Sequence, residues 1–395
     1  MKGTFCNYIF LCLAVFLGTL SLLPPLAMYG LDSTPDVTFE PFIPQTAPEQ
    51  VGAYAPNTKL DTDIKFIEGP HGAETVAFSK HGDMYFSNKA GEIRYIEAEL
   101  LDGHISNNMS TYSGVANRTI GKLLVQAGRP VGMYIDAEDR LLVADAVKGL
   151  LRVDLETRDV NILTSGANGT KLIFLDDVKT GPDGMIYISD SARIGPLMDK
   201  NGDWNILTSA TFAIASSKPD GRLLSYDPQT KETKVLMQGI RFANGVLVDP
   251  TGNSVYVCET STYRVWRYWL KGINAGKSMV FIDNLPGYPD GINLGSDNRL
   301  YISLYGGRSK LVDWIHHFPS VKRLLLRIPF VKFPIYPPMI VIADPNSGEI
   351  LDSLQGTRSS PLKSLTSAVE HDGRLYIGNL HLNFIGVYDL NGNRQ

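Results

Sequence analysis

Cysteine is scarce in this chain of 395 residues, which contains only three. Cys6 and Cys12 lie in an apolar N-terminal run, so Cys258 has no disulfide partner in the rest of the chain. The residues VYVC that end at Cys258 are typical of a buried strand, where a thiol packs as a small apolar group. A disulfide framework is therefore excluded, and we expect a hydrophobic core to hold the fold.

Neither sign of charge is in large excess, because 37 basic residues face 41 acidic ones and leave a formal net charge of −4. Without a basic field, the chain does not favour nucleic acid as a partner. The seven histidines do not follow a zinc-ligand spacing, and no Cys-His cluster occurs. What is abundant is Gly (37), Pro (23) and Tyr (18), a composition that favours strands and turns over helices.

One long hydrophobic run is present, at residues 4–23, and Pro24-Pro25 ends it. Its length is about that needed to cross a bilayer as a helix. Lys2 precedes the run and acidic residues follow it, so the positive-inside rule predicts a type II signal anchor over residues 1–28, with the body on the lumenal or extracellular side. A cleaved signal peptide is the alternative, since AMYG follows Pro25.

Three N-glycosylation sequons are consistent with passage through the secretory pathway. They begin at Asn108, Asn117 and Asn168. We expect these three residues to be glycosylation sites.

One short pattern recurs six times: a turn with Gly, Asp or Asn, then an apolar strand that often carries Tyr. The copies are 81–88, 137–146, 181–191, 249–260, 295–305 and 370–379. Most are followed by a second strand pattern, at 91–99, 148–157, 221–230, 261–272 and 384–392. Hairpins at this pitch predict an all-β fold, a six-bladed β-propeller over residues 59–395, rather than a β-sandwich. We expect residues 59–68 to close the ring by pairing with the last blade.

Two regions depart from the repeat. Residues 29–58 are Pro-rich and aperiodic, which is typical of a stalk between membrane and propeller. Residues 307–338 form a basic and strongly apolar insertion in the fifth blade, with helical character. This insertion is predicted to be a lid over the channel mouth, a membrane-contacting patch, or a helix packed on the propeller side.

Four polar residues stand where the inner strand of a blade is expected to begin. They are Glu74, Asp176, Asn244 and Asp290. Inner strands line the channel of a propeller, so these side chains can converge although they are far apart in sequence. Three carboxylates and one amide oxygen suit Ca²⁺. The competing interpretation is that they are ordinary turn or cap residues.

Several motifs together resemble the strictosidine synthase-like family of propellers. They are APNTKL (55–60), GRPVGM (128–133), ADAVKGLL (144–151), GRLLSYDPQTKETKVL (221–236), RFANGV (241–246), ET (259–260), NLPGYPDGI (284–292) and EHDGRLYIG (370–378). The resemblance implies a branch of the calcium-dependent six-bladed propellers that include paraoxonases and gluconolactonases, and thus hydrolysis of an ester or lactone. It also implies that Glu74, Asp176, Asn244 and Asp290 hold the channel cation.

The chain departs from the family pattern in two places. It has Asp176-Asp177 where relatives usually have Asn-Asp, and Asp290-Gly291 where many have Asp-Asn. The histidine dyad of paraoxonases also has no counterpart, so the catalytic nucleophile or base would be Asp290 or another carboxylate.

Three functions follow as hypotheses. The first is a calcium-dependent hydrolase of a small-molecule aryl ester or lactone, in which the cation polarises the carbonyl. The second is a strictosidine synthase-type condensation of an amine with an aldehyde, which needs a general acid/base carboxylate and no metal. The third is a non-catalytic adhesion or receptor propeller at the cell surface.

Overall fold

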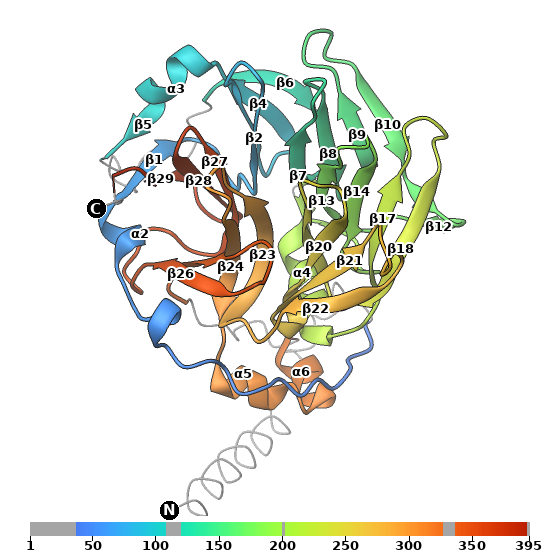
Figure 1. Cartoon of the computed structure of the whole chain (residues 1–395), viewed down its shortest axis with the longest axis vertical. Helices are drawn as coiled ribbons and strands as arrows, with labels where there is room; N and C mark the ends of the chain where they lie inside the picture. The colour runs from blue at the N-terminus through green and yellow to red at the C-terminus, as the bar shows by residue number, and fades with distance from the viewer. Residues whose placement is uncertain (1–36, 108–119, 200–201, 327–335, 393–395) are drawn as a thin grey trace, which may run out of the picture.

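The computed structural model describes residues 37–107, 120–199, 202–326 and 336–392. It contains six sheets of at least four antiparallel strands each, arranged around a common centre (Figure 1). The innermost strands β2, β7, β13, β19, β23 and β27 contact one another in sequence around this centre. The prediction of an all-β six-bladed propeller is confirmed.

In blades 1–5 the strands follow one another along the chain from the inside outwards, whereas the two outermost strands of blade 6 come from the N-terminal part of the propeller. Blade 1 contains β2 (Val76–Phe78), β3 (Met84–Ser87), β4 (Glu92–Ile96) and β6 (Lys122–Gln126), and blade 2 contains β7 (Pro130–Ile135), β8 (Leu141–Asp145), β9 (Gly149–Val153) and β10 (Val160–Thr164). Blade 3 contains β13 (Leu175–Thr180), β14 (Ile186–Asp190), β17 (Gly221–Tyr226) and β18 (Thr233–Ile240), and blade 4 contains β19 (Ala243–Val248), β20 (Ser254–Glu259), β21 (Arg264–Trp269) and β22 (Ser278–Ile282). Blade 5 contains β23 (Gly287–Leu294), β24 (Leu300–Gly307), β25 (Met339–Ala343) and β26 (Ile350–Gln355). Blade 6 contains β27 (Leu365–His371), β28 (Arg374–Asn379), β29 (Phe384–Asp389), β1 (Ile64–Glu68) and the short β5 (Ile105–Ser106).

The remaining elements lie in the connections. The short strands are β11 (Gly166–Ala167), β12 (Thr170–Lys171), β15 (Leu197–Met198) and β16 (Trp204–Asn205). The helices are η2 (Gly52–Tyr54), α2 (Lys59–Thr62), α3 (Ala98–His104), α4 (Ile206–Ser216), η3 (Thr260–Thr262), α5 (Lys310–Ile315) and α6 (Pro319–Leu326). The last two lie between β24 and β25 of blade 5.

The six repeat copies correspond to the second strand of each blade, and the companion patterns to the third. The second strands β3, β8, β14 and β20 are buried along their whole length because both faces pack against neighbouring blades. In four blades the second strand ends in a polar residue whose side chain accepts hydrogen bonds from backbone N–H groups of a nearby loop. These residues are Asp145, Asp190, Glu259 and Asn379. Asp190 Oδ1, for example, accepts hydrogen bonds from the backbone N–H groups of Ile173 (3.1 Å) and Phe174 (2.9 Å), directly before β13. In blades 2, 3 and 4 the repeat therefore fixes where the channel-lining strand of the same blade begins.

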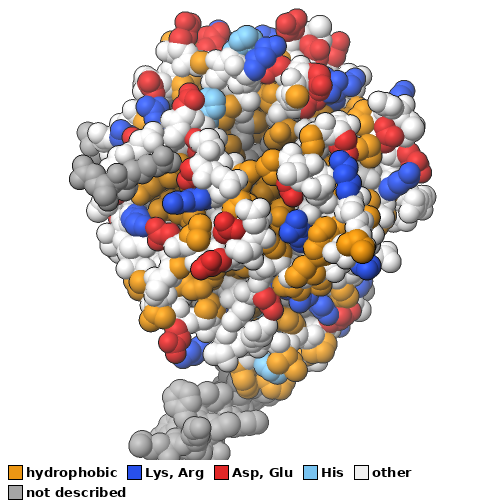
Figure 2. All heavy atoms as spheres, viewed as in Figure 1, with side chains coloured by type: hydrophobic (Ala, Val, Ile, Leu, Met, Phe, Trp, Pro, Cys, Tyr) orange, Lys and Arg blue, Asp and Glu red, His pale blue; other side chains and the backbone are white. Residues whose placement is uncertain are grey.

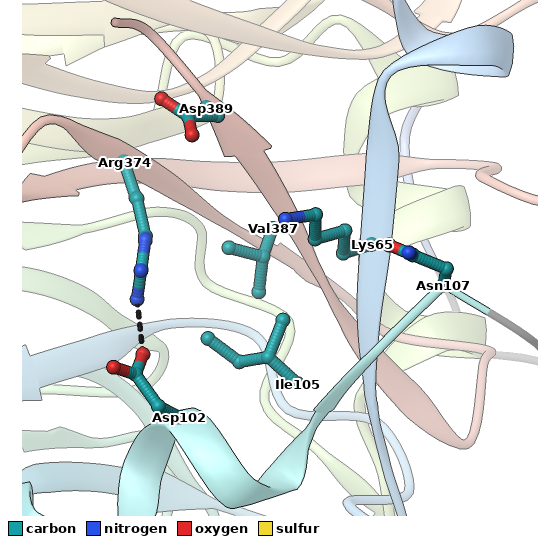
Figure 3. Close-up of a pocket in the computed structure, with 7 residues that line it drawn as sticks. All are labelled: Lys65, Asp102, Ile105, Asn107, Arg374, Val387 and Asp389. Carbon is teal, nitrogen blue, oxygen red and sulfur yellow. Dashed lines mark hydrogen bonds and ion pairs between the residues drawn. The ribbon is translucent and has the colours of Figure 1, made fainter. Parts of the chain in front are cut away.

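The ring is closed between the two ends of the propeller. Strand β1 pairs antiparallel with β29, from Ile64 opposite Tyr388 to Glu68 opposite Phe384. The predicted pairing is confirmed for residues 64–68, while residues 59–62 form α2. Beside this seam, Asp102 of α3 accepts a hydrogen bond from Arg374 of β28 at 2.5 Å, and Figure 3 shows this pair at the edge of a cavity of about 280 Å³.

The described part of the 29–58 segment lies against the propeller. Glu40 N donates to Ser216 O at 2.8 Å, and Phe42 N donates to His316 O at 3.1 Å. Farther along, Asn57 Nδ2 donates to Ser353 O at 3.0 Å. We call residues 37–58 the strap, which runs past α5 and α6 in Figure 1. No helix among the described residues is long and apolar enough to span a membrane, and the run at 4–23 lies outside them.

Close approach of neighbouring blades depends on glycine in the inner strands. A Cβ added to Gly132 would lie 2.4 Å from Asp176 O of the next blade, and one added to Gly245 would lie 2.4 Å from Asp290 O. At Gly291 the corresponding atom is Thr366 O, at 2.6 Å. These separations are far below van der Waals contact, so a side chain at any of the three positions would push two blades apart.

We therefore expect Gly245→Ala to lower the free energy of unfolding by about 1–3 kcal/mol or more, because the added methyl overpacks the blade interface. Chemical denaturation measures the change. Gly103→Ala is the matched control, since Gly103 lies in α3 with nothing within 4 Å of an added Cβ. It should be neutral or stabilising by up to about 1 kcal/mol. Equal effects of the two substitutions would contradict the packing role of Gly245.

Candidate functional site

All four predicted site residues line one small cavity in the channel. Glu74 precedes β2, Asp176 lies in β13, Asn244 in β19 and Asp290 in β23, and each is at most 7% exposed. The cavity measures about 20 Å³. This volume admits one water-sized group, for which about 10–15 Å³ is enough. The convergence that the sequence predicted is therefore present in the fold.

Irregularities in the inner strands place three of these side chains. The register between β13 and β14 shifts between Leu175 and Val178, around Asp176. Corresponding shifts occur between Ala243 and Val246, and between Pro289 and Ile292. A β-bulge re-aims the side chains of its extra residues, and such bulges concentrate next to functional sites. Asp176, Asn244 and Asp290 thus lie within bulged strands and not in turns.

Three of the four carboxyl groups that line the cavity destabilise one another as anions. Burial raises the pKa of Glu74 well above its usual value, and the nearby Asp176 raises it further. Burial also raises the pKa of Asp290 well above its usual value, with Glu74 and Asp176 adding to the effect. For Asp176 the pKa rises to about 7, chiefly through burial. Without a bound cation, the site therefore favours protonated carboxyl groups.

The surroundings of Asp176 are consistent with a retained proton. Ser191 Oγ lies 2.5 Å from Asp176 Oδ2 and 2.6 Å from Ala243 O. One hydroxyl carries a single proton, so it cannot donate to both oxygens. Donation from Ser191 to Asp176 lowers the pKa of the carboxyl group and opposes the effect of burial, whereas a protonated Asp176 that donates to Ser191 leaves the hydroxyl free to donate to the carbonyl of Ala243.

Two further charged residues support the cavity, and sequence reasoning did not select them. Arg129, which is 2% exposed, favours the ionised form of Glu74. Asp177 of blade 3 accepts a hydrogen bond from Val246 N of blade 4 at 2.9 Å, which joins the two blades. It also forms an ion pair with Lys179 at 3.2 Å. Arg129 stands in the motif GRPVGM, which was available as a signal.

The oxygen atoms that the four predicted site residues present are the kind of ligand that a hard cation prefers. They are carboxyl and amide oxygens, and Glu74 Oε2 is buried without a hydrogen-bond partner among the described residues. In the same described ranges, however, no three His, Cys, Asp or Glu side chains come together as a complete metal-ligand group. The four side chains thus share a cavity without forming a closed coordination shell.

Gly291 has a structural explanation that the sequence did not reveal. It occupies the same kind of close contact as Gly132 and Gly245, against the carbonyl of the next blade. The missing amide at this position therefore reflects tight packing between blades 5 and 6.

A second, larger cavity lies at the channel mouth, and helices α4, α5 and α6 contribute to its wall. It measures about 380 Å³ and is mostly apolar. We call it the mouth pocket; among its lining residues are Ile214, Tyr288, Tyr305, Val312, Lys322 and His381. Figure 2 shows hydrophobic side chains at the lower edge of the molecule, where α5 and α6 lie. There Leu311, Trp314 and Phe318 are 61%, 40% and 42% exposed.

Tyr305 lines the mouth pocket and lies within electrostatic range of the carboxyl cavity. Its hydroxyl lies 2.7 Å from Nε2 of His381, which is at the exposed rim of the pocket. Burial raises the pKa of Tyr305 to about 12, and Asp290 and Glu74 add to this rise. Sequence reasoning missed this pair. The available signal was the fifth repeat copy, which carries Leu304-Tyr305 where most other copies end in Asp, Glu or Asn.

Of the three sequons, only Asn168 lies in the described part of the chain. It is exposed, at the turn between β11 and β12, with a positive φ of 50°. Asn108 and Asn117 lie outside the described residues.

Comparison with known proteins identifies the family. The strictosidine synthase family model matches residues 176–273, and a model of the strictosidine synthase-like N-terminal region matches residues 52–95. The adipocyte plasma membrane-associated protein of Bos taurus is 32% identical over 390 residues, which cover 95% of this chain and 89% of the bovine protein. The chain belongs to the strictosidine synthase-like family.

Other members of the strictosidine synthase-like family align over a similar length. The adipocyte plasma membrane-associated protein of Homo sapiens is 31% identical over 398 residues, covering 97% of this chain and 90% of the human protein. The protein STRICTOSIDINE SYNTHASE-LIKE 3 of Arabidopsis thaliana is 28% identical over 347 residues, covering 85% and 86% of the two chains.

Solved structures share the fold at much lower identity. A gluconolactonase from Xanthomonas campestris superimposes with a TM-score of 0.56 at 14% identity, over 82% of this chain and 89% of that protein. A calcium-binding protein, regucalcin, from Agrobacterium tumefaciens superimposes with a TM-score of 0.52 at 15% identity, over 82% and 92%. At these identities the likeness establishes the propeller fold of this strictosidine synthase-like chain.

Asp176→Asn tests the electrostatic cost of the cavity. Because the folded pKa of about 7 lies above the usual 3.8, ionisation of Asp176 removes stability as the pH rises between these values. A difference of about three pH units corresponds to about 4 kcal/mol, so Asp176→Asn should stabilise the calcium-free chain by up to that amount near pH 8. The gain should shrink towards pH 4.

Urea denaturation in the presence of a chelator measures this pH dependence. Asp372→Asn is the matched control, because the Asp372 side chain is 88% exposed, and it should change stability by less than about 0.5 kcal/mol. A gain from Asp176→Asn that is the same near pH 4 and near pH 8 would contradict the buried-ionisation model.

Proposed function

We propose that this chain is a calcium-dependent hydrolase of aryl esters or lactones. The observation that carries the proposal is the presence of two spaces: a cavity lined by Glu74, Asp176, Asn244 and Asp290, and the apolar mouth pocket, whose residue Tyr305 lies within electrostatic range of Glu74 and Asp290. The first space has the donors for a hard cation, and the second has the size of a small-molecule site, commonly 300–1,000 Å³.

Ca²⁺ would be held by Glu74, Asp176, Asn244 and Asp290, with the orphaned Glu74 Oε2 as one ligand atom. When bound, the ion supplies positive charge that polarises the substrate carbonyl and stabilises the developing oxyanion. The chain's own contribution is to hold several oxygen donors together on side chains that are each at most 7% exposed. Because burial raises the pKa values of Glu74 and Asp290, ionising these carboxyl groups costs free energy, and the positive charge of a bound cation offsets that cost.

The mouth pocket would hold the acyl or aryl part of the substrate among apolar side chains. Tyr305 and His381 form a hydrogen-bonded pair on the wall of this pocket, so they can accept and return a proton beside the reacting group. Asp290 is the other candidate nucleophile or base, and it serves only in its ionised form.

The proposal includes a membrane location. The apolar run at 4–23 would anchor the chain as a type II membrane protein, with the propeller on the lumenal or extracellular side and glycans on Asn108, Asn117 and Asn168. Exposed Leu311, Trp314 and Phe318 on the 307–338 insertion support its contact with the membrane surface. The insertion would then serve both as the lid of the mouth pocket and as the membrane contact.

We expect the purified chain to bind Ca²⁺ and to hydrolyse phenyl acetate or an aliphatic lactone only when Ca²⁺ is present. Glu74→Gln and Asp290→Asn keep side-chain volume but remove anionic donors, so each should lower kcat by roughly 10²-fold or more. Calorimetric titration with Ca²⁺ and steady-state kinetics measure the two effects, and Asp372→Asn serves as the control that leaves both unchanged.

The alternatives predict different outcomes in the same measurements. Ca²⁺ binding without hydrolysis of any ester or lactone would favour the non-catalytic surface propeller, which the incomplete metal-ligand group also favours. Condensation of tryptamine with secologanin, independent of Ca²⁺, would favour the strictosidine synthase-type reaction suggested by the family model at residues 176–273. Activity that persists in the combined Glu74→Gln and Asp290→Asn variant would contradict the proposed hydrolase.

Tyr305→Phe tests the proton-carrying pair. The substitution removes the hydroxyl that contacts His381 and keeps the ring, so kcat should fall by about 10²-fold with little change in KM. Tyr256→Phe is the matched control, because its hydroxyl donates to Pro345 O at 3.0 Å away from both cavities. It should cost about 1 kcal/mol of stability and leave kcat unchanged. An unchanged kcat in Tyr305→Phe would assign the tyrosine to packing.

A further inference from the structure

Lys322 is a lysine buried in the wall of the mouth pocket. It lies in α6 and is 4% exposed, whereas lysine is almost never fully buried unless it is paired. Its pocket neighbours from helices α4, α5 and α6 are largely apolar, including Ile214, Val312, Ile315 and Leu325. A positive charge is thus held beside an apolar space.

All hydrogen-bond acceptors of the Lys322 ammonium are neutral. Nζ donates to Glu40 O at 3.0 Å and to Ser217 Oγ at 3.1 Å. The third contact, to His316 Nδ1, is the longest at 3.4 Å. Burial, with a contribution from Lys322, lowers the pKa of His316 to about 3, so this imidazole is an uncharged acceptor.

The ammonium has no anionic partner within ion-pair distance in the described ranges of the chain. The Glu40 carboxylate favours the charged lysine from farther away, but it lies 3.9 Å from Arg241. A buried charge is normally paired, because desolvation costs several kcal/mol per ion. Lys322 and its contact His316 both line the mouth pocket, so this pocket is the space beside the ammonium that an anion could enter.

We propose that the mouth pocket binds an aliphatic monocarboxylate, with the carboxylate on Lys322 Nζ and the alkyl chain among the apolar side chains of α4, α5 and α6. The carboxylate replaces the long contact to His316 and accepts a charge-assisted hydrogen bond. The volume of about 380 Å³ accommodates such a ligand. A lactone opened by hydrolysis yields a hydroxy carboxylate of this class, but the binding itself does not depend on the proposed hydrolase activity.

The pH dependence follows from the charges that face Lys322. Burial and Arg241 lower the pKa of Lys322 to about 8, Glu40 opposes them, and His316 stays neutral above its own pKa of about 3. The other ionisable residues of the pocket wall are Tyr288, Tyr305, Tyr336 and His381. Burial raises the pKa of Tyr288 and Tyr305 to about 12, so these phenols stay neutral. Carboxylate affinity should therefore fall as the pH rises through about 8, where Lys322 loses its charge.

The test is a calorimetric titration of the full chain, kept in solution by an amphipathic polymer, with octanoate, 1-octanol and octylammonium as probes. Octanoate should bind, and Lys322→Met should weaken it about tenfold or more while changing 1-octanol affinity by less than about threefold. Octylammonium should not bind. Lys322→Arg should retain octanoate, because it keeps the positive charge.

Lys310→Met is the matched control, since Lys310 is an exposed lysine of α5 on the same lid, and it should leave all three affinities unchanged. Should Lys322→Met fail to fold, the wild-type pH series still decides: octanoate affinity should drop about tenfold between about pH 7 and about pH 9.5. An affinity that is flat over this range, or equal binding of octanoate and octylammonium, overturns the proposal. Loss of esterase activity with retained octanoate binding would overturn the proposed hydrolase and leave this site standing.

Discussion

The antiparallel pairing of β1 with β29 is the constraint on which the rest of the structure depends. The strand that follows the strap completes the last blade, so the six sheets form a closed ring and the inner strands face one another. Only in a closed ring do residues from blades 3, 4 and 5 and the connection before blade 1 meet at one point. The hydrogen bonds of five residue pairs therefore position side chains that are more than two hundred residues apart in sequence.

The convergence of these side chains carries an unfavourable electrostatic free energy. Glu74, Asp176 and Asp290 are buried together, and burial with mutual repulsion raises the pKa of each. Glycines at the blade contacts and bulges in the inner strands hold the three groups in place despite this cost. Structures commonly depart from local folding rules at functional sites. Here the strand bulges, the close-contact glycines and the buried carboxyl groups all occur at a single cavity.

The fifth blade and the strap together shape the channel mouth. Strand β24 continues to Gly307 and carries Tyr305 into the wall of the mouth pocket, and the following helices α5 and α6 form part of the same pocket. The strap lies against these helices through Phe42 N and His316 O, and through Glu40 O and Lys322 Nζ. A segment expected to be a stalk thus supplies contacts to α5 and α6 in the wall of the mouth pocket.

The sequence by itself determined the six repeats, the closing strand and the four polar residues at the start of inner strands, because strand periodicity and turn chemistry are local properties of a chain. The tertiary structure alone decided that Gly291 is a packing glycine, that Tyr305 meets His381, and that Lys322 is buried without an ion-pair partner in the described residues. These facts depend on contacts between blades and between the strap and helices α5 and α6. No local pattern encodes such contacts, since they arise only when distant segments pack.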